Sequence, residues 1–130
     1  IAMATTIVAN NGTLFRPQLI QEKEPEIIDK DIIKKEILEI VRKGMREAVV
    51  SGTARYLSDL VVNAAGKTGT AETAKNKAPH SWFTVFAPYE NPEIVITILI
   101  ENGGEGSSTA VPIAKEALNW YFRDKAQSFQ

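Results

Sequence analysis

A run of aliphatic residues in the last third of the chain limits the folds that are open to it. Residues 94–100 have the sequence IVITILI, in which six of seven side chains are aliphatic. Such a run, in which apolar and polar residues do not alternate, is typical of a β-strand that is covered on both faces. A turn precedes it at 88–92, and a glycine-rich loop follows it at 103–108. The run therefore predicts a strand over 93–101 in the middle of a sheet.

Two more strand-like segments precede this run. They span residues 64–74 and 82–87, and the segments that join the three strands are short. Short connections can link antiparallel neighbours, whereas parallel strands need a long crossover. We therefore expect an antiparallel meander. Helical patterns at 1–10, 31–50 and 109–122 complete an α+β fold, in which helices pack on the faces of an antiparallel sheet.

The helical segments differ in how clearly they indicate a buried face. In the first, Met3 and Ile7 fall on one side of a helix that ends near 10–12. In the second, apolar residues recur at helical spacing and charged residues, Arg42 among them, fill the opposite, solvated side. The apolar set comprises Ile33, Ile37, Ile40, Val41, Met45, Ala48 and Val49. The polar segment 19–29 is expected to form a surface excursion or a short hairpin.

Side chains that can cap a helix stand before two of these segments. Asp29 or Asp31 precedes the second helix, and Ser108 or Thr109 precedes the last one. Oxygen-bearing side chains of this kind accept hydrogen bonds from the free N–H groups of a helix's first turn. We expect one residue of each pair to be an N-cap.

The composition narrows the classes of function. The chain has 130 residues, of which 44% are hydrophobic, and a formal net charge of −1. These values favour a single folded domain and argue against a disordered segment or an electrostatic nucleic-acid binder. The absence of cysteine excludes disulfides and thiolate metal sites, and a lone histidine, His80, gives little basis for a metal site. We expect neither a metal nor a cofactor.

Targeting segments and membrane spans have recognisable apolar patterns. No apolar run reaches the length of a membrane span, and no signal peptide opens the chain. Ile1 is not a natural start, and the first residues already have the pattern of a helix interior. We therefore interpret residues 1–130 as a piece of a longer protein.

The stretch 66–72, with the sequence GKTGTAE, combines groups that suit an anionic acyl substrate. Lys67 supplies a fixed positive charge. Thr68 and Thr70 project their hydroxyls to the same side of an extended backbone, because they are two residues apart. Gly69 between them has no Cβ, so a ligand can lie close to the main chain. The N–H of the residue after such a glycine is then free to face a reacting carbonyl.

The same residues could also close a phosphate-binding P-loop. That loop needs a glycine five residues before Gly66, and Val61 stands there. A P-loop must also open into a helix, whereas the sequence KNKAP at 75–79 soon breaks the chain. The sequence therefore disfavours a nucleotide site.

With its flanks, the Lys-Thr-Gly tripeptide resembles the third sequence element of the penicillin-recognising serine acyltransferases. Downstream segments resemble the end of a penicillin-binding protein transpeptidase domain, at residues 80–83, 86–88 and 101–104. The similarity extends from Met3 to about Phe122 and is strongest to class B enzymes of the elongation type. It implies the C-terminal segment of the β-lactamase/transpeptidase-like fold, with the nucleophile half of the single transpeptidase domain outside residues 1–130.

The resemblance implies a peptidoglycan D,D-transpeptidase that crosslinks the cell wall, serves cell shape and works through a serine acyl-enzyme. It gives Lys67 and Thr70 catalytic roles: Lys67 would pair with a hydroxyl of the second element, and the Thr70 N–H would be one arm of an oxyanion hole. Thr68, Gly69 and Thr70 would bind the substrate. The threonines would hold the carboxylate of a donor peptide or a β-lactam, and Gly69 would let the ligand reach the strand edge.

Two elements of such a site do not occur in the sequence. There is no Ser-x-x-Lys, so Ser51, Ser81, Ser107 and Ser108 lack the lysine that activates a nucleophile. Residues 89–91 are spelled like a variant of the second element, but they follow the third element and lie in a turn, so we interpret them as coincidence. This chain alone should be inactive. The alternative reading of the whole protein is a non-catalytic penicillin-binding sensor or binding domain.

The resemblance also implies partners and a location. Peptidoglycan stem peptides and β-lactams would be the ligands, and the rest of the same transpeptidase domain would be the main protein contact. A membrane anchor would lie before residue 1, on a protein that works in the periplasm at the inner membrane. Of the nearby segments, 51–54 is expected near the substrate groove. Trp82 is expected in the core or a loop, with a place lining the site as the alternative. By the same resemblance, two further strands of the sheet would lie before residue 1, so in this chain alone the 93–101 strand would have an open edge that allows self-association.

Overall fold

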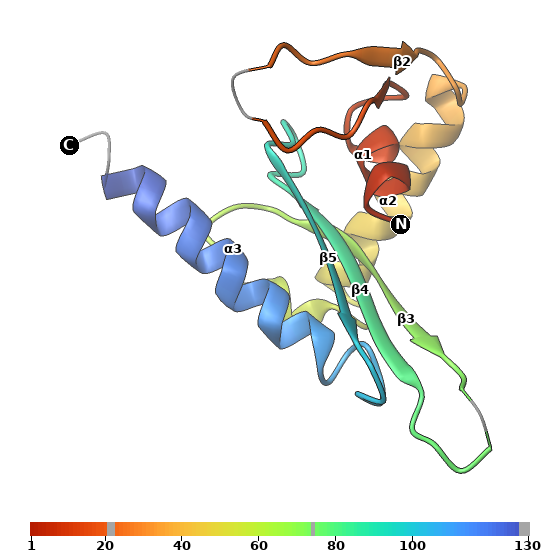
Figure 1. The fold of residues 1–130 in the computed structure, drawn as a ribbon. Helices are drawn as coiled ribbons and strands as arrows, with labels where there is room; N and C mark the ends of the chain where they lie inside the picture. Colours follow the sequence, from red (N-terminus) through yellow and green to blue (C-terminus); the bar gives the residue numbers. More distant parts are fainter. Residues whose placement is uncertain (21–22, 74, 128–130) are drawn as a thin grey trace.

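The computed structural model describes residues 1–20, 23–73 and 75–127, which form one three-stranded sheet with helices on both sides (Figure 1). The elements follow one another as α1 (Ala2–Ala9), β1 (Leu14–Phe15), β2 (Ile27–Asp29), α2 (Lys35–Val50), the short 3-10 helix η1 (Arg55–Leu57), β3 (Ala65–Ala71), β4 (His80–Ala87), β5 (Ile94–Ile100) and α3 (Ala110–Gln127). Among the described residues, no helix is both long and apolar enough to cross a membrane.

The sheet is the predicted antiparallel meander, in the order β3-β4-β5. Its register pairs Lys67 with Thr84 and Thr84 with Thr97, so one residue of each strand lies in the same row. Strands β3 and β5 lie within the predicted segments, and β4 begins two residues earlier than expected, at His80. The α+β fold class is therefore confirmed.

The aliphatic strand β5 has the open edge that the sequence predicts for this chain by itself. Helix α1 packs against one of its faces and α3 against the other, as expected for an apolar run (Figure 1). Within the described residues, β5 pairs only with β4, so it lies at the edge of the sheet. A strand suited to a central position therefore has one open edge.

The two faces of β4 organise the core. Phe83 and Val85 are fully buried on the face that packs against α3, where they meet apolar side chains of that helix. Phe86 is fully buried on the other face, in a cluster that includes Ala9 and Met45 from α1 and α2. Burying a phenylalanine side chain contributes about 2–3 kcal/mol, so these residues are a main support of the sheet.

Helix α2 buries only part of the face that the sequence indicated. Met45 and Val49 of the expected set are buried, together with Leu38 and Arg42, whereas Ile33, Ile37, Ile40 and Val41 are exposed. The sequence pattern therefore predicted the buried face correctly in the second half of the helix and wrongly in the first. The prediction that Arg42 belongs to the solvated side was also wrong. The buried stripe is selected by contacts with α1 and the sheet, which the local sequence does not show.

The expected N-cap of α2 is wrong, because the helix begins after Lys34, which makes no side-chain capping bond, and Asp31 lies in the left-handed region with φ 54°. Thr109 directly precedes α3, which is the expected N-cap position, and its hydroxyl donates to the carbonyl oxygen of Gly103. The Ser108 hydroxyl donates to that of Glu105.

Helix α1 has the predicted position and end, but another buried face. Asn10 is its C-cap, and Asn11 and Gly12 follow with positive φ, as the sequence indicated. Met3 is exposed, and the buried residues are Thr5 and Ala9. The Thr5 and Thr84 hydroxyls are 2.8 Å apart, which turns the Thr5 side of the helix toward the sheet. The segment 19–29 forms part of a two-stranded hairpin through β2, and its residues 21–22 lie outside the described residues.

Candidate functional site

The GKTGTAE stretch forms most of strand β3, which begins at Ala65. Among the described strands, β3 pairs only with β4, so its other edge is open. Gly66 is buried at the start of the strand because Phe83 lies under it: a Cβ at this position would be 2.6 Å from the Phe83 ring. The first glycine of the stretch is thus needed for packing, and the residues that follow emerge toward solvent.

The register of β3 places the two threonines on one side. Thr68 and Thr70 are opposite Phe83 and Ser81, whose side chains face α3, so both hydroxyls share that face as predicted. Lys67 is opposite Thr84, whose hydroxyl meets Thr5 of α1, so the lysine leaves the strand on the other face. Charge and hydroxyls therefore flank the same open edge from opposite faces. Lys67 and Thr70 are exposed and Thr68 is half-buried.

Two neighbouring segments hold the motif strand in place. The Thr53 hydroxyl is 2.8 Å from the Thr68 hydroxyl, so the loop after α2 touches the motif directly. This loop belongs to the segment 51–54 that the sequence placed near the groove. Arg46 of α2 donates to the carbonyl oxygen of Ala64, immediately before the strand, at 2.9 Å. Lys67 donates its ammonium to the carbonyl oxygen of Thr68.

A small hollow of about 140 Å³ lies on the lysine face of the strand. Lys67, Gly69, Trp82 and Thr84 contribute to its walls. Trp82 is half-buried there, and a Cβ on Gly69 would be 3.1 Å from the Trp82 Cβ, so the tryptophan borders the motif glycine. Of the two roles considered for Trp82, a core or loop position and a place lining the site, this contact agrees with the second.

His80 has a structural contact at the start of β4. Its Nδ1 accepts a hydrogen bond from the Asn102 N–H at 3.0 Å, which joins β4 to the turn after β5. Over the residues that the structure describes, no group of three or more histidine, cysteine, aspartate or glutamate side chains could hold a metal ion.

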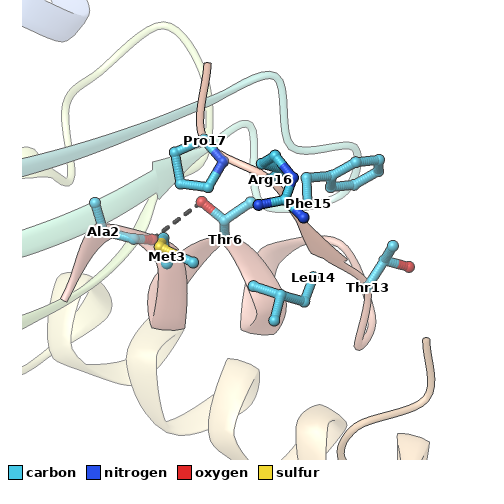
Figure 2. Close-up of a pocket in the computed structure, with 8 residues that line it drawn as sticks. All are labelled: Ala2, Met3, Thr6, Thr13, Leu14, Phe15, Arg16 and Pro17. Atoms are coloured by element: carbon cyan, nitrogen blue, oxygen red, sulfur yellow. Dashed lines mark hydrogen bonds between the residues drawn. The ribbon is translucent and has the colours of Figure 1, made fainter. Parts of the chain in front are cut away.

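A separate cavity of about 220 Å³ lies between α1 and the segment 13–17 (Figure 2). Its walls are mostly apolar, with Met3, Leu14 and Pro17 among the residues drawn around it. The Thr6 hydroxyl at this cavity already donates to the carbonyl oxygen of Ala2. No residue of the motif lines it, so it is separate from the site on β3.

The four serines considered as nucleophiles are bonded to glutamate oxygens. Ser51 donates to Glu47, and Ser81, Ser107 and Ser108 donate to Glu105. None of these hydroxyls meets a lysine amine, which is the partner that activates a serine of this kind. The motif strand therefore supplies charge and hydrogen-bonding groups, and an acyl-accepting serine would have to come from elsewhere.

Known proteins with similar sequences include transpeptidases of cell-wall synthesis. Residues 1–119 match the family described as penicillin binding protein transpeptidase domain. The chain belongs to this family. Peptidoglycan D,D-transpeptidase MrdA of Haemophilus influenzae is 32% identical over 152 aligned residues, which cover 96% of this chain and 23% of MrdA.

Solved structures of penicillin-binding proteins have the same fold. The penicillin-binding protein PBP2 from Helicobacter pylori is 30% identical and matches with a TM-score of 0.80, over 94% of this chain and 23% of that one. The imipenem acyl-enzyme complex of penicillin-binding protein A from M. tuberculosis is 25% identical, with a TM-score of 0.75 over 88% of this chain and 28% of that one. The chain thus spans about a quarter of the length of these relatives, and the resemblance noted in its sequence is confirmed.

Proposed function

We propose that residues 1–130 are the C-terminal part of the transpeptidase domain of a peptidoglycan D,D-transpeptidase. The observation that carries the proposal is the Lys-Thr-Gly-Thr sequence on the open edge of β3, within a chain that belongs to the transpeptidase family. MrdA, a family member with similar sequence, is a peptidoglycan D,D-transpeptidase. The nucleophile and the second element would come from the part of the protein that precedes this chain.

In this proposal the motif residues bind and polarise an acyl group at the strand edge. Lys67 contributes positive charge and pairs with a hydroxyl of the second element. Thr68 and Thr70 bind the carboxylate of a stem peptide or a β-lactam, which their shared face supports. Gly69 leaves room for the ligand beside the main chain.

The direction of the Thr70 N–H supports its assignment to an oxyanion hole. Residues of an antiparallel strand turn their N–H groups alternately toward the partner strand and away from it. A Cβ added to Gly106 would lie within 3.1 Å of the Gly69 nitrogen, the Gly69 carbonyl oxygen and the Trp82 carbonyl oxygen. These three atoms are this close together because the N–H and C=O groups of Gly69 point toward β4. The Thr70 N–H is then turned toward the open edge, where a developing oxyanion would accept its hydrogen bond.

The family also supports a proposal for ligands and location. Penicillin-binding protein A of M. tuberculosis forms an acyl-enzyme with imipenem, so we propose that β-lactams acylate the complete protein here as well. Its natural ligand would be a peptidoglycan stem peptide. Peptidoglycan lies outside the inner membrane, so the domain would work in the periplasm, held by an anchor that precedes this chain.

The proposal is tested by labelling the full-length protein with fluorescent penicillin and measuring the intact mass. We expect one covalent adduct on the full-length protein and none on residues 1–130 alone. In the full-length protein, Lys67→Ala should slow acylation by about 100- to 1,000-fold, because one stabilising group for the oxyanion is lost. Lys77→Ala, which removes an exposed lysine from the β3–β4 connection, is the control and should leave the rate unchanged.

Two outcomes would contradict the proposal. An adduct on residues 1–130 would mean that one of the serines dismissed above is a nucleophile. Undiminished acylation of Lys67→Ala would mean that the motif is only structural. Release of D-alanine from a stem-peptide substrate separates the two readings of the whole protein, because a sensor domain would be labelled by penicillin without turning over the peptide.

A further inference from the structure

Gly106 lies against the main chain of the motif strand. It is buried, although it belongs to the loop between β5 and α3, here called the β5–α3 loop (residues 101–109). A Cβ at this position would lie 2.4 Å from the carbonyl oxygen of Trp82, 2.7 Å from that of Gly69 and 3.1 Å from the Gly69 nitrogen. All three atoms belong to the backbone, so none can move aside as a flexible side chain would.

Space, and not backbone conformation, requires glycine at 106. The φ of Gly106 lies outside the left-handed range, so this angle does not itself require glycine. Gly104, two residues earlier, has the opposite character: its φ is 81°, and a Cβ there would meet nothing within 4 Å. The loop thus holds one glycine needed for its turn and another needed for contact with β3 and β4.

Hydrogen bonds on both sides of Gly106 prevent the loop from moving away. Ser81, which is fully buried opposite Thr70, donates to the carbonyl oxygen of Glu105 at 3.2 Å. The Gly104 N–H donates to the carbonyl oxygen of Pro79 at 3.0 Å, and the Val111 N–H of α3 donates to that of Gly106 at 3.0 Å. Any displacement of the loop breaks bonds to the strand or to the helix.

We propose that Gly106 is a positioning residue that sets the Gly69–Thr70 peptide and hence the direction of the Thr70 N–H. The β5–α3 loop rests on the α3 face of β3 and braces the strand behind its open edge. A side chain at 106 pushes on the Gly69 backbone and turns the next N–H away from the oxyanion. The inference rests on the proposed function, in which that N–H contacts the acyl oxygen.

The test compares Gly106→Ala with Gly104→Ala in the full-length transpeptidase. Both substitutions add a methyl group to the β5–α3 loop, but only the methyl at 106 would clash with the backbone of the motif strand. Acylation by a fluorescent penicillin, followed by stopped flow, should slow on the order of 10- to 100-fold for Gly106→Ala, since displacements of about 1 Å can cost this much. Gly104→Ala should stay within about threefold of the wild type, because strain confined to the loop does not reach the reacting groups.

A spectroscopic measurement separates positioning from general loss of structure. In the infrared difference spectrum of the acyl-enzyme made with carbonyl-labelled penicillin, strong hydrogen bonds to the acyl oxygen lower the stretching frequency. We expect a higher frequency in Gly106→Ala than in the wild type and no change in Gly104→Ala. Equal rates and equal frequencies in the wild type and Gly106→Ala would overturn the inference, as would an equal loss in Gly104→Ala.

Two further results remain informative. If Gly106→Ala does not fold, Ser81→Ala loosens the loop without adding an atom and should slow acylation between about two- and tenfold, with the same direction of frequency change. An unchanged rate and frequency in Ser81→Ala would then overturn the inference. A wild-type protein that penicillin never acylates contradicts the proposed function itself, which is a different outcome from an acylated wild type that tolerates alanine at 106.

Discussion

The guanidinium of Arg42 lies inside the protein, between α1, α2 and the turn after β4. It donates to the carbonyl oxygens of Val8 and Ala9 at the end of α1, and to that of Tyr89 at 2.6 Å. Its carbon Cζ is 4.9 Å from the centre of the Phe86 ring. Charge at a helix C-terminus is favourable, and here it replaces the carboxylate that a buried arginine usually requires.

Replacing this arginine should therefore destabilise the fold. Arg42→Met keeps most of the side-chain stem but leaves buried carbonyl oxygens without donors, at a cost of about 2–4 kcal/mol. Lys43→Met, one position along on the exposed side of α2, should change stability by less than about 0.5 kcal/mol. Urea unfolding of both variants measures the difference. Equal midpoints would show that the guanidinium bonds contribute nothing net.

Glu90 provides a pH-dependent contact near the start of the motif strand. The Asn63 amide donates to its carboxylate at 2.7 Å, and this hydrogen bond, helped by the backbone and by the charge of Arg46, holds the pKa of Glu90 below its ordinary value of 4.5. A folded-state pKa below the unfolded one gives stability that is present above the unfolded value. That stability is lost as the pH falls through the lower, folded value.

We expect the stability of Glu90→Gln to fall less at acid pH than that of the wild type. Between pH 7 and pH values well below 4.5, the urea midpoint of the wild type should fall more than that of the variant. Glu116→Gln removes a negative charge from the exposed side of α3 and is the control. The Lys115 hydrogen bond lowers the pKa of Asp59 in the same way, so the wild-type loss has a second source that both variants keep. Parallel profiles of wild type and Glu90→Gln would contradict the assignment.

At the scale of elements, the strands could be predicted, and the helix faces only in part. Apolar runs bounded by turns determine where β4 and β5 lie, because few other structures bury so many adjacent aliphatic side chains. The buried stripe of α2 depends instead on what packs against it, and two apolar stripes competed on that helix. The same holds for the site. The spacing of Thr68 and Thr70 predicted that they share a face of the strand. The contact of Gly106 with the motif strand could not be predicted, because Gly106 belongs to a loop that is distant in the sequence.

The glycine that opens the motif gives a test of packing at this scale. Gly66→Ala would place a methyl 2.6 Å from the Phe83 ring and 2.8 Å from the Thr84 carbonyl oxygen, so it should destabilise the domain by about 1–3 kcal/mol. Gly44→Ala has the opposite expectation. It lies inside α2 with nothing within 4 Å of its added methyl, and should stabilise by about 0.5–1 kcal/mol. Thermal unfolding of both variants measures the two signs, and a stable Gly66→Ala would show that β3 can move away from Phe83.

At the scale of the whole molecule, the apolar strand β5 has a neighbouring strand on only one side among the described residues. Helices cover both faces of β5, yet among the described residues its outer edge is unpaired along seven residues. Unpaired N–H and C=O groups on a flat apolar strand are a template for another strand. In the complete transpeptidase proposed here, additional strands of the same domain would occupy this edge. In the 130-residue chain by itself, a second copy is the available partner.

The chain alone should therefore self-associate through β5. Leu99 is 42% exposed on that strand, and Leu99→Lys places a charged side chain on the edge strand, where charge disfavours pairing with another strand. Ile113 is 43% exposed on α3, so Ile113→Lys adds the same charge away from the edge and serves as a matched control. Light scattering over a concentration series should show association of the wild type and of Ile113→Lys, and a shift toward monomer for Leu99→Lys. A wild-type chain that stays monomeric at high concentration would show that the open edge is protected by the twist of the sheet or by its flanking side chains, and that its aliphatic sequence serves only the two covered faces.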